Sequence, residues 1–292
     1  MNSTPKLKIT KNKINDDISI QDIYFQKQFR KTLKLLWIQP KSIEIVAIGS
    51  LLSTDFNTIE EFDDISGYYQ NILHNLKTEF DIPIVFVGSN FNMQRKNIGC
   101  EKSKGKILIP KCIFINEDGE NNIYKINLVN SKKHVDFNYS FEKIEYKESK
   151  QKIILKNETS KTDFYDMIEK SKKLIKNNIL EKIVISRKKK YKFNFDWIEQ
   201  LSFLKKANII FPESTTFLFN FTEDDIFFGV TPETLFKING TQFYSEALAG
   251  TFDATENYPK SKETKEHNYV IDYIEKVISN FSIEKKTQTN PY

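Results

Sequence analysis

Cysteine and histidine are scarce in this chain, which has 2 Cys and 3 His among its 292 residues. Cys100 and Cys112 have no other cysteine or histidine at ligand spacing around them. This pattern excludes a disulfide framework and a thiolate metal site. It is typical of a protein from a reducing compartment.

Long apolar runs are absent as well. No stretch approaches the roughly 18 uninterrupted apolar residues that a membrane-spanning helix needs. The N-terminus carries Lys6, Lys8, Lys11 and Lys13 but lacks the apolar segment of a signal peptide. We therefore expect a soluble, cytoplasmic protein with no membrane partner.

The chain also lacks a strong excess of either charge. Its 44 Lys and Arg nearly balance 39 Asp and Glu, and the formal net charge of +5 is small for this length. Nucleic acid is therefore not an expected partner. The lysine run at 188–190 could bind phosphate, but such runs are more often the solvated ends of strands or helices.

Apolar residues are plentiful enough for a sizeable core. They make up 39% of the sequence, which is compatible with one large domain or two ordinary ones. Residues 1–20 are polar and weakly patterned, and indicate a loose arm or an edge strand. Apolar residues then repeat at helical spacing over 59–80. Strands are predicted at 43–51, 82–87, 106–110, 112–116 and 122–129, with an Asp118-Gly119 turn before the last.

The second half begins with a polar stretch, 132–159, which we interpret as a crossover inside one domain. Ser160-x-x-Asp163 is a helix-capping pattern, and the helix that follows should end at Asn177-Asn178. Further helices are predicted at 196–207 and 263–281. Strands are predicted at 182–193, 216–220, 226–230, 235–238 and 242–248, with Asn239-Gly240 as a tight turn.

Ionisable residues gather at the ends of these second-half elements. Lys182 starts an apolar strand, where burial would lower its pKa toward that of a base, although a lysine whose charge reaches solvent at a strand edge is the more frequent case. Glu233 follows a Thr-Pro turn and either points off a sheet edge or caps a helix. Gly250 lets the backbone approach a ligand or another strand, and Glu266 offers one hard oxygen to a metal ion.

Taken together and in order, these segments resemble the motifs of the chorismate-binding enzymes. That family contains isochorismate, salicylate, anthranilate and aminodeoxychorismate synthases. The matching segments are KIVISR at 182–187, Thr231-Pro232-Glu233 in place of Ser-Pro-Glu, ALAGT at 247–251, and Lys262-Glu263-x-x-Glu266-His267. The resemblance is best over the catalytic part at 160–281 and looser in the N-terminal half.

The resemblance implies an α+β fold in which antiparallel sheets pack face to face with helices outside. It also implies one chorismate-binding domain over 1–292, with 1–20 as a loose arm. The substrate would be chorismate. Lys182 would act as general base toward water and Glu233 as general acid toward the leaving hydroxyl. Gly250 and Thr251 would bind the substrate carboxylate, Glu266 would bind Mg²⁺, and His267 would support the site without binding the metal.

Two branch-specific positions favour the isochorismate synthase type. Members that use ammonia typically lack the lysine at the position of Lys182, and the aminodeoxychorismate branch has a lysine at the position of Ala249. Salicylate synthase remains an alternative, and the pathway served, whether menaquinone, siderophore or salicylate, stays open. The family continues past the position of Tyr292 with further substrate and metal ligands. We therefore expect an incomplete domain, monomeric or completed by a C-terminal polypeptide, with a non-catalytic fragment as the other possibility.

Overall fold

The computed structural model describes residues 4–15, 17–76, 78–90, 105–129, 140–146, 151–221, 225–249 and 261–281, with residues 284 and 287. The chain divides into two compact units. Unit 1 comprises Met1–Ser149 and Phe195–Thr231, and unit 2 comprises Lys150–Asn194 and Pro232–Tyr292. The first boundary falls inside the polar stretch interpreted as a crossover.

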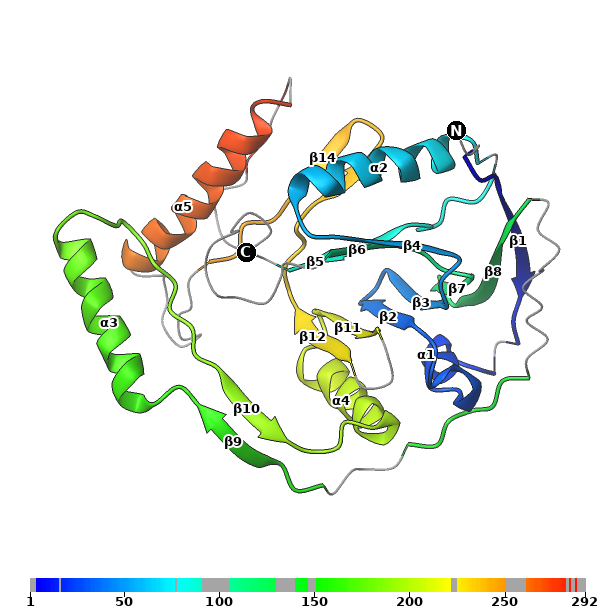
Figure 1. The fold of residues 1–292 in the computed structure, drawn as a ribbon, viewed down its shortest axis with the longest axis horizontal. Helices are drawn as coiled ribbons and strands as arrows, with labels where there is room; N and C mark the ends of the chain where they lie inside the picture. The colour runs from blue at the N-terminus through cyan, green and yellow to red at the C-terminus, as the bar shows by residue number, and fades with distance from the viewer. Residues whose placement is uncertain are drawn as a thin grey trace. The chain divides into compact units, whose positions relative to one another are not determined.

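Unit 1 is built on a seven-stranded antiparallel sheet with the order β1-β8-β7-β3-β2-β11-β12 (Figure 1). Its strands are β1 (Leu7–Lys13), β2 (Lys34–Gln39), β3 (Ile43–Ile48), β7 (Cys112–Glu117), β8 (Glu120–Leu128), β11 (Thr215–Asn220) and β12 (Ile226–Thr231). Strand β11 pairs with β2, with Leu218 opposite Leu36. The second half of the chain therefore completes a sheet that the first half begins.

Both faces of this sheet are buried. Its central strands β3 and β7 have buried apolar residues at successive positions, and successive side chains of a strand point to opposite faces. Val46 and Ile48 pack with helices α1 (Ile20–Tyr24) and α4 (Trp197–Ile210) and the short 3-10 helix at Lys27–Phe29. Ile45 and Ala47 pack with helix α2 (Ile59–His74) and a second sheet. That three-stranded sheet has the order β4 (Leu52–Phe56), β6 (Gly105–Ile109), β5 (Phe86–Ser89).

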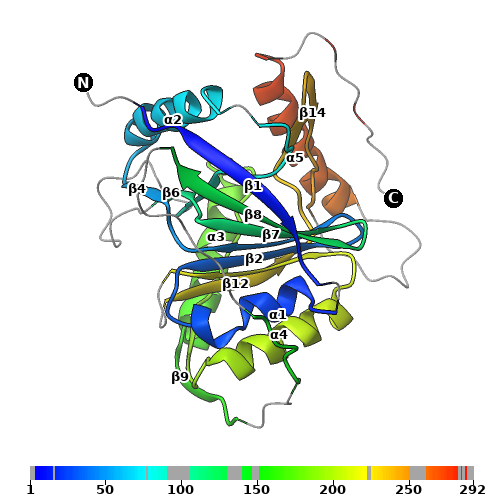
Figure 2. The same cartoon turned by 90° about the vertical axis from the view of Figure 1, so that its right-hand side faces the viewer.

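The result is a layered α+β architecture, as expected. Figure 2 shows α1 and α4 on one face of the large sheet and α2 on the other. The Asp118-Gly119 turn joins β7 to β8 with positive φ at both residues, 52° and 84°, as a tight hairpin turn requires. In the part of the chain that the structure describes, every helix is too short or too polar to span a bilayer.

The described part of unit 2 contains two helices and two small antiparallel sheets. Its elements are β9 (Ile154–Glu158) paired with β10 (Lys189–Lys192), α3 (Lys161–Lys176), β13 (Lys237–Asn239) paired with β14 (Gln242–Tyr244), and α5 (Ser261–Ile278). The Ser160 hydroxyl accepts a hydrogen bond from the Asp163 N–H and so caps α3. Asn178 follows this helix with φ of 54°, the left-handed conformation expected there.

Unit 2 buries few of its side chains. Among its described residues, Ser171 and Ile271 alone are buried. Val277 lies at helical spacing from Val270 and Ile274, which predicts an inward position on α5, but its side chain is exposed. Large apolar side chains are exposed in both of the chain segments that form unit 2. They include Ile179, Val184, Leu235, Ile238 and Phe281. Little apolar area therefore stabilises unit 2 on its own.

Several predicted strands differ from the observed ones. Of the two alternatives for residues 1–20, a loose arm or an edge strand, the structure shows the edge strand: β1 pairs with β8 at the edge of the large sheet. The strand predicted at 82–87 is observed at Phe86–Ser89, beyond Pro83, which has no N–H to donate. The strand predicted at 182–193 is observed only at Lys189–Lys192, where β9 supplies backbone hydrogen bonds. Residues 182–188 are apolar enough for a strand, but β structure also needs a neighbouring strand.

Candidate active site

Lys182 and Glu266 form an ion pair within unit 2. Lys182 lies in the segment between α3 and β10, and Glu266 lies near the start of α5. The lysine Nζ is 3.3 Å from the glutamate Oε1, and the two side chains are 28% and 32% exposed. The fold therefore brings together two candidate residues that lie far apart in the sequence. Partial burial leaves this pair less screened by water than an ion pair on the open surface.

Glu233 lies in an extended segment between β12 and β13. Its side chain is exposed, and it follows Pro232 directly after the end of β12 at Thr231. The next residue, Thr234, donates its backbone N–H to Oε2 of Glu246 at 2.8 Å. Ser245 adds a second link by donating its hydroxyl to the Leu235 carbonyl at 2.8 Å. The Glu233 segment is thus attached through side chains to the segment after β14.

Glu246, to which the sequence motifs gave no role, is a further acidic residue of this arrangement. Besides Thr234, its carboxylate accepts a hydrogen bond from the Tyr244 hydroxyl, at 2.8 Å to Oε1. Burial acts to raise the pKa of Glu246, but the hydrogen bonds from Tyr244 and Thr234 and the charge of Lys237 outweigh it and lower that pKa. Its sequence signal was weak, because an acidic residue next to a short strand usually faces solvent.

His267 connects α5 to the ALAGT segment. Its Nε2 lies 2.9 Å from the Ala247 carbonyl oxygen, so Nε2 carries the proton and donates it to this bond. A supporting role for His267 was expected, and this contact is of that kind. Gly250 and Thr251, expected to bind the substrate carboxylate, lie outside the described residues.

The carboxylates of α5 offer oxygen ligands of the kind that Mg²⁺ prefers. Glu263 lies one helical turn before Glu266, and its Oε2 is buried with no hydrogen-bond partner among the described residues. A buried carboxylate oxygen without a partner is costly unless a cation or water satisfies it. No group of three or more potential ligand side chains occurs among the residues that the structure describes. The donor set thus fits a magnesium ion that receives its other ligands from water or substrate.

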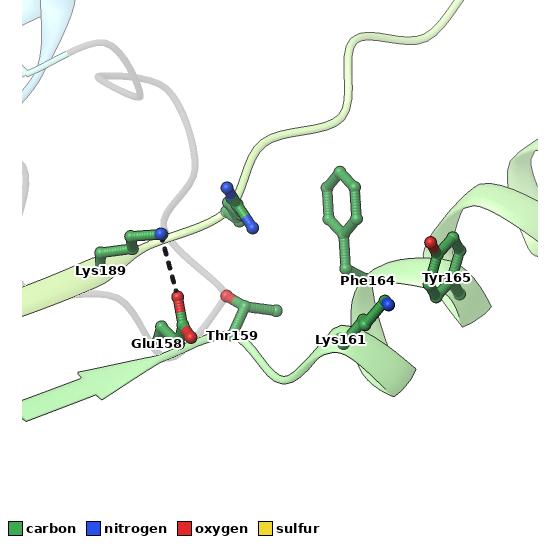
Figure 3. Close-up of a pocket in the computed structure, with 7 residues that line it drawn as sticks. Glu158, Thr159, Lys161, Phe164, Tyr165 and Lys189 are labelled. Carbon is green, nitrogen blue, oxygen red and sulfur yellow. Dashed lines mark ion pairs between the residues drawn. The ribbon is translucent and has the colours of Figure 1, made fainter.

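A small pocket lies at the N-terminal end of α3, outside this arrangement. It is lined by residues that include Thr159, Lys161, Phe164 and Arg187. Figure 3 shows Lys189 and Glu158 facing each other across β10 and β9, with the first turn of α3 opposite; their Nζ and Oε2 are 3.2 Å apart. The Arg187 guanidinium lies 5.9 Å from the Phe164 ring centre. The pocket contains Arg187 of the KIVISR segment but none of Lys182, Glu233 and Glu266.

The roles that the resemblance implies for Lys182 and Glu233 also predict that the two side chains face a common pocket, and this stays a prediction. The described contacts do not join Lys182 to Glu233 directly, but they connect the chain segments in which the two residues lie. Glu266 reaches the Lys182 segment, His267 reaches Ala247, and Glu246, next to Ala247 in sequence, reaches Thr234 beside Glu233. These contacts therefore join all four motifs, directly or through one neighbouring residue.

Comparisons with known proteins agree with the motifs. The family model described as chorismate binding enzyme matches residues 2–292. MenF, the menaquinone-specific isochorismate synthase from Escherichia coli, has a similar fold at 17% identity, with a TM-score of 0.66 over 97% of this chain and 66% of its own. DhbC from Bacillus anthracis, a putative 2,3-dihydroxybenzoate-specific isochorismate synthase, is similar at 17% identity, with a TM-score of 0.61 over 91% of this chain and 64% of its own.

A search of curated protein sequences gave no match. This chain spans about two thirds of the length of the two solved synthases. The family match covers nearly the whole chain, and the contacts described above link the described parts of the motifs. On these grounds the protein belongs to the chorismate-binding enzyme family.

Proposed function

We propose that this chain carries the proton-transfer residues of an isochorismate synthase, which converts chorismate to isochorismate. The observation that carries the proposal is the contact between Lys182 and Glu266, 3.3 Å apart, which brings two family motifs together. Both solved neighbours are named as isochorismate synthases, one of them putatively. The lysine at 182 and the alanine at 249 favour a water-using member over those that use ammonia or a lysine nucleophile.

In the proposed reaction, water adds at C2 of chorismate while the C4 hydroxyl leaves. Lys182, released from its ion pair with Glu266 and present as the neutral amine, takes a proton from the attacking water. Glu233, as the neutral acid, gives a proton to the departing hydroxyl, which leaves as water. One water is consumed and one is released, so the product is an isomer of the substrate. Each such proton transfer contributes on the order of 10² to 10⁴ in rate.

A magnesium ion is part of the proposal. Glu266 would hold it, and Glu263 supplies a second carboxylate on the same helix, with one oxygen buried and without a hydrogen-bond partner among the described residues. When bound, the ion would neutralise the substrate carboxylate and fix its position. Gly250 and Thr251 are proposed to form the binding site of that carboxylate, which is called the substrate seat below.

We further propose that turnover requires the remainder of the catalytic domain. The chain spans 66% and 64% of the two solved synthases, and unit 2 leaves large apolar side chains exposed. We use the term completed enzyme for residues 1–292 fused to, or mixed with, a polypeptide equivalent to the remaining third of those synthases. Holding a substrate in the reactive geometry is worth about 7–11 kcal/mol of a barrier, more than one acid or base supplies.

The test is incubation of residues 1–292, and of the completed enzyme, with chorismate and Mg²⁺, followed by chromatography of the products. We expect little or no isochorismate from residues 1–292 alone and ordinary turnover from the completed enzyme. A completed enzyme that leaves chorismate unchanged would refute the proposal. Formation of salicylate and pyruvate would instead assign the chain to the salicylate synthase branch. Ordinary turnover by residues 1–292 alone would show that the substrate seat lies within this chain.

A further inference from the structure

The backbone around Glu233 lacks the support of regular secondary structure. Strand β12 ends at Thr231 and β13 begins only at Lys237. Pro232, between them, has no N–H to donate. A catalytic acid must be held close to its productive geometry, and a loop position does this poorly unless other groups fix it. The contacts of residues 232–236 therefore decide how well Glu233 is placed.

Glu246 supplies one of these contacts with a charged acceptor. Its Oε2 accepts the backbone N–H of Thr234 at 2.8 Å, one residue from Glu233. Its Oε1 accepts the Tyr244 hydroxyl at 2.8 Å, which fixes the other side of the carboxylate. Hydrogen bonds to an ionised acceptor are roughly twice as strong as neutral ones. The neighbouring bond from Ser245 to the Leu235 carbonyl, also 2.8 Å, ties the same two segments together.

Glu246 is poorly suited to be the acid itself. Both of its oxygens already accept hydrogen bonds, one from the backbone and one from a tyrosine. The same bonds contribute to a lowered pKa, so the carboxyl group is ionised near neutral pH and has no proton to give. Its geometry suits a group that holds the loop in place.

We propose that Glu246 is a positioning residue, which fixes the extended segment 232–236 through the Thr234 N–H and thereby orients the Glu233 side chain. The inference rests on the proposed function, in which Glu233 is the general acid. The residue after Glu246, Ala247, accepts a hydrogen bond from His267 through its carbonyl. This contact connects the Glu246 segment to α5, the helix that carries Glu266. The reacting side chains would then be held relative to one another by side-chain to backbone contacts rather than by a strand ladder.

The first test needs no activity and uses residues 1–292. In Glu246→Ala, amide hydrogen exchange of the peptide spanning 233–236 should accelerate roughly tenfold, because the Thr234 N–H loses a charged acceptor. Glu246→Gln should restore most of the protection, since its amide oxygen can accept from Thr234 and its NH₂ can donate to Tyr244. The control Glu169→Ala removes an exposed carboxylate that pairs with Lys172 on α3, and should leave this peptide unchanged.

Two outcomes of this exchange measurement would overturn the proposal. One is unchanged exchange at 233–236 in Glu246→Ala. The other is an equal acceleration throughout unit 2, which would mean that Glu246 stabilises the unit generally and does not specifically hold the segment 232–236.

The second test uses the completed enzyme. Glu246→Ala should lower kcat roughly tenfold with little change in KM, because the substrate seat is untouched while the acid is misplaced. In a Glu233→Gln background the same substitution should cause almost no further loss, since residues that act as a unit are non-additive. Equal losses in both backgrounds, or a Glu246→Gln enzyme as impaired as Glu246→Ala, would overturn the positioning role. If Glu233→Gln alone left kcat unchanged, the proposed function would fail instead.

Discussion

Lys34 is a cationic residue inside the core of unit 1. Its side chain is 3% exposed, and its Nζ donates a hydrogen bond to the Tyr24 carbonyl at 2.8 Å and lies 4.3 Å from the centre of the Tyr24 ring. The Tyr24 hydroxyl in turn bonds Asn220 on β11. Burial lowers the pKa of Lys34 to about 7, and the charge of Arg30 adds to the effect. The neutral amine is therefore well populated in the folded protein near physiological pH.

This shift predicts a pH-dependent stability. Above pH 7 the unfolded chain binds a proton at Lys34 that the folded chain does not, up to the ordinary lysine pKa near 10.4. The free energy of unfolding should therefore rise with pH in this window, by on the order of 1 kcal/mol per unit for this residue. Urea denaturation of the wild type and of Lys34→Met between pH 7 and 9 would measure it. The difference between the two proteins should grow with pH, and a constant difference would show that Lys34 titrates normally.

Lys182 makes the contact on which the catalytic proposal depends. Replacing it with alanine in the completed enzyme should lower the rate of isochorismate formation by roughly 10²- to 10⁴-fold, because the attacking water loses its base. Lys172→Ala is a matched control, since Lys172 also pairs with a glutamate of unit 2, Glu169, at 2.8 Å but lies on α3 outside the site. Steady-state kinetics on both variants would check this. Comparable activity of the two variants would contradict the role of Lys182.

At the level of elements, the three-stranded sheet of unit 1 depends on one close approach. Gly105, the first residue of β6, lies opposite Phe56 of β4. A Cβ at Gly105 would overlap the Phe56 ring, which is itself buried in the core with α2. Glycine thus lets an aromatic side chain of the neighbouring strand cover the backbone.

Gly105→Ala should therefore destabilise unit 1 by about 1–3 kcal/mol, the usual cost of forcing extra volume into a packed site. Gly88→Ala provides the comparison within the same sheet, because a Cβ at Gly88 on β5 would meet no atom within 4 Å. Chemical denaturation of both variants, followed by tryptophan fluorescence, would measure the difference. Equal stability of the two variants would mean that the Phe56 ring moves aside freely.

At the scale of the whole molecule, the two units differ in how much core they have. Unit 1 buries apolar residues on both faces of its large sheet, whereas the described residues of unit 2 bury little beyond Ile271. The long helices α3 and α5 therefore rest on few buried contacts. Segments with little buried apolar area open locally with low free energies.

Amide exchange of residues 1–292 should reflect this difference. We expect the amides of α3 and α5 to exchange at least tenfold faster than those of β3 and β7 in the centre of the large sheet. In the completed enzyme, protection should rise in α5 and in residues 182–188, where added backbone and apolar contacts would form. Protection of α5 equal to that of β3 in the isolated chain would contradict this account of unit 2.

Much of the local structure could be predicted because it depends on neighbouring residues. The Ser160 cap, the Asp118-Gly119 hairpin and the left-handed Asn178 each follow from side-chain or backbone preferences over a few positions. The apolar runs of β3 and β7 likewise indicated strands. The order of four motifs was enough to suggest the family, because motif order is a property of the sequence alone.

Other features depend on residues that meet only after folding. Strand pairing depends on which backbone lies alongside a segment, and a local sequence pattern does not specify the neighbouring strand. This applies to the pairing of β11 with β2, to the edge position of β1, and to residues 182–188, which form no strand. The same holds for the site. Lys182, Glu233 and Glu266 were predictable as motif residues, but the Lys182–Glu266 pair and the hold of Glu246 on Thr234 are tertiary contacts. By itself the sequence determined the residue types and their order. Only the tertiary structure determined that the Glu266 carboxylate pairs with the Lys182 amine and that the Glu246 carboxylate accepts the Thr234 N–H, because these residues come together only when the chain folds.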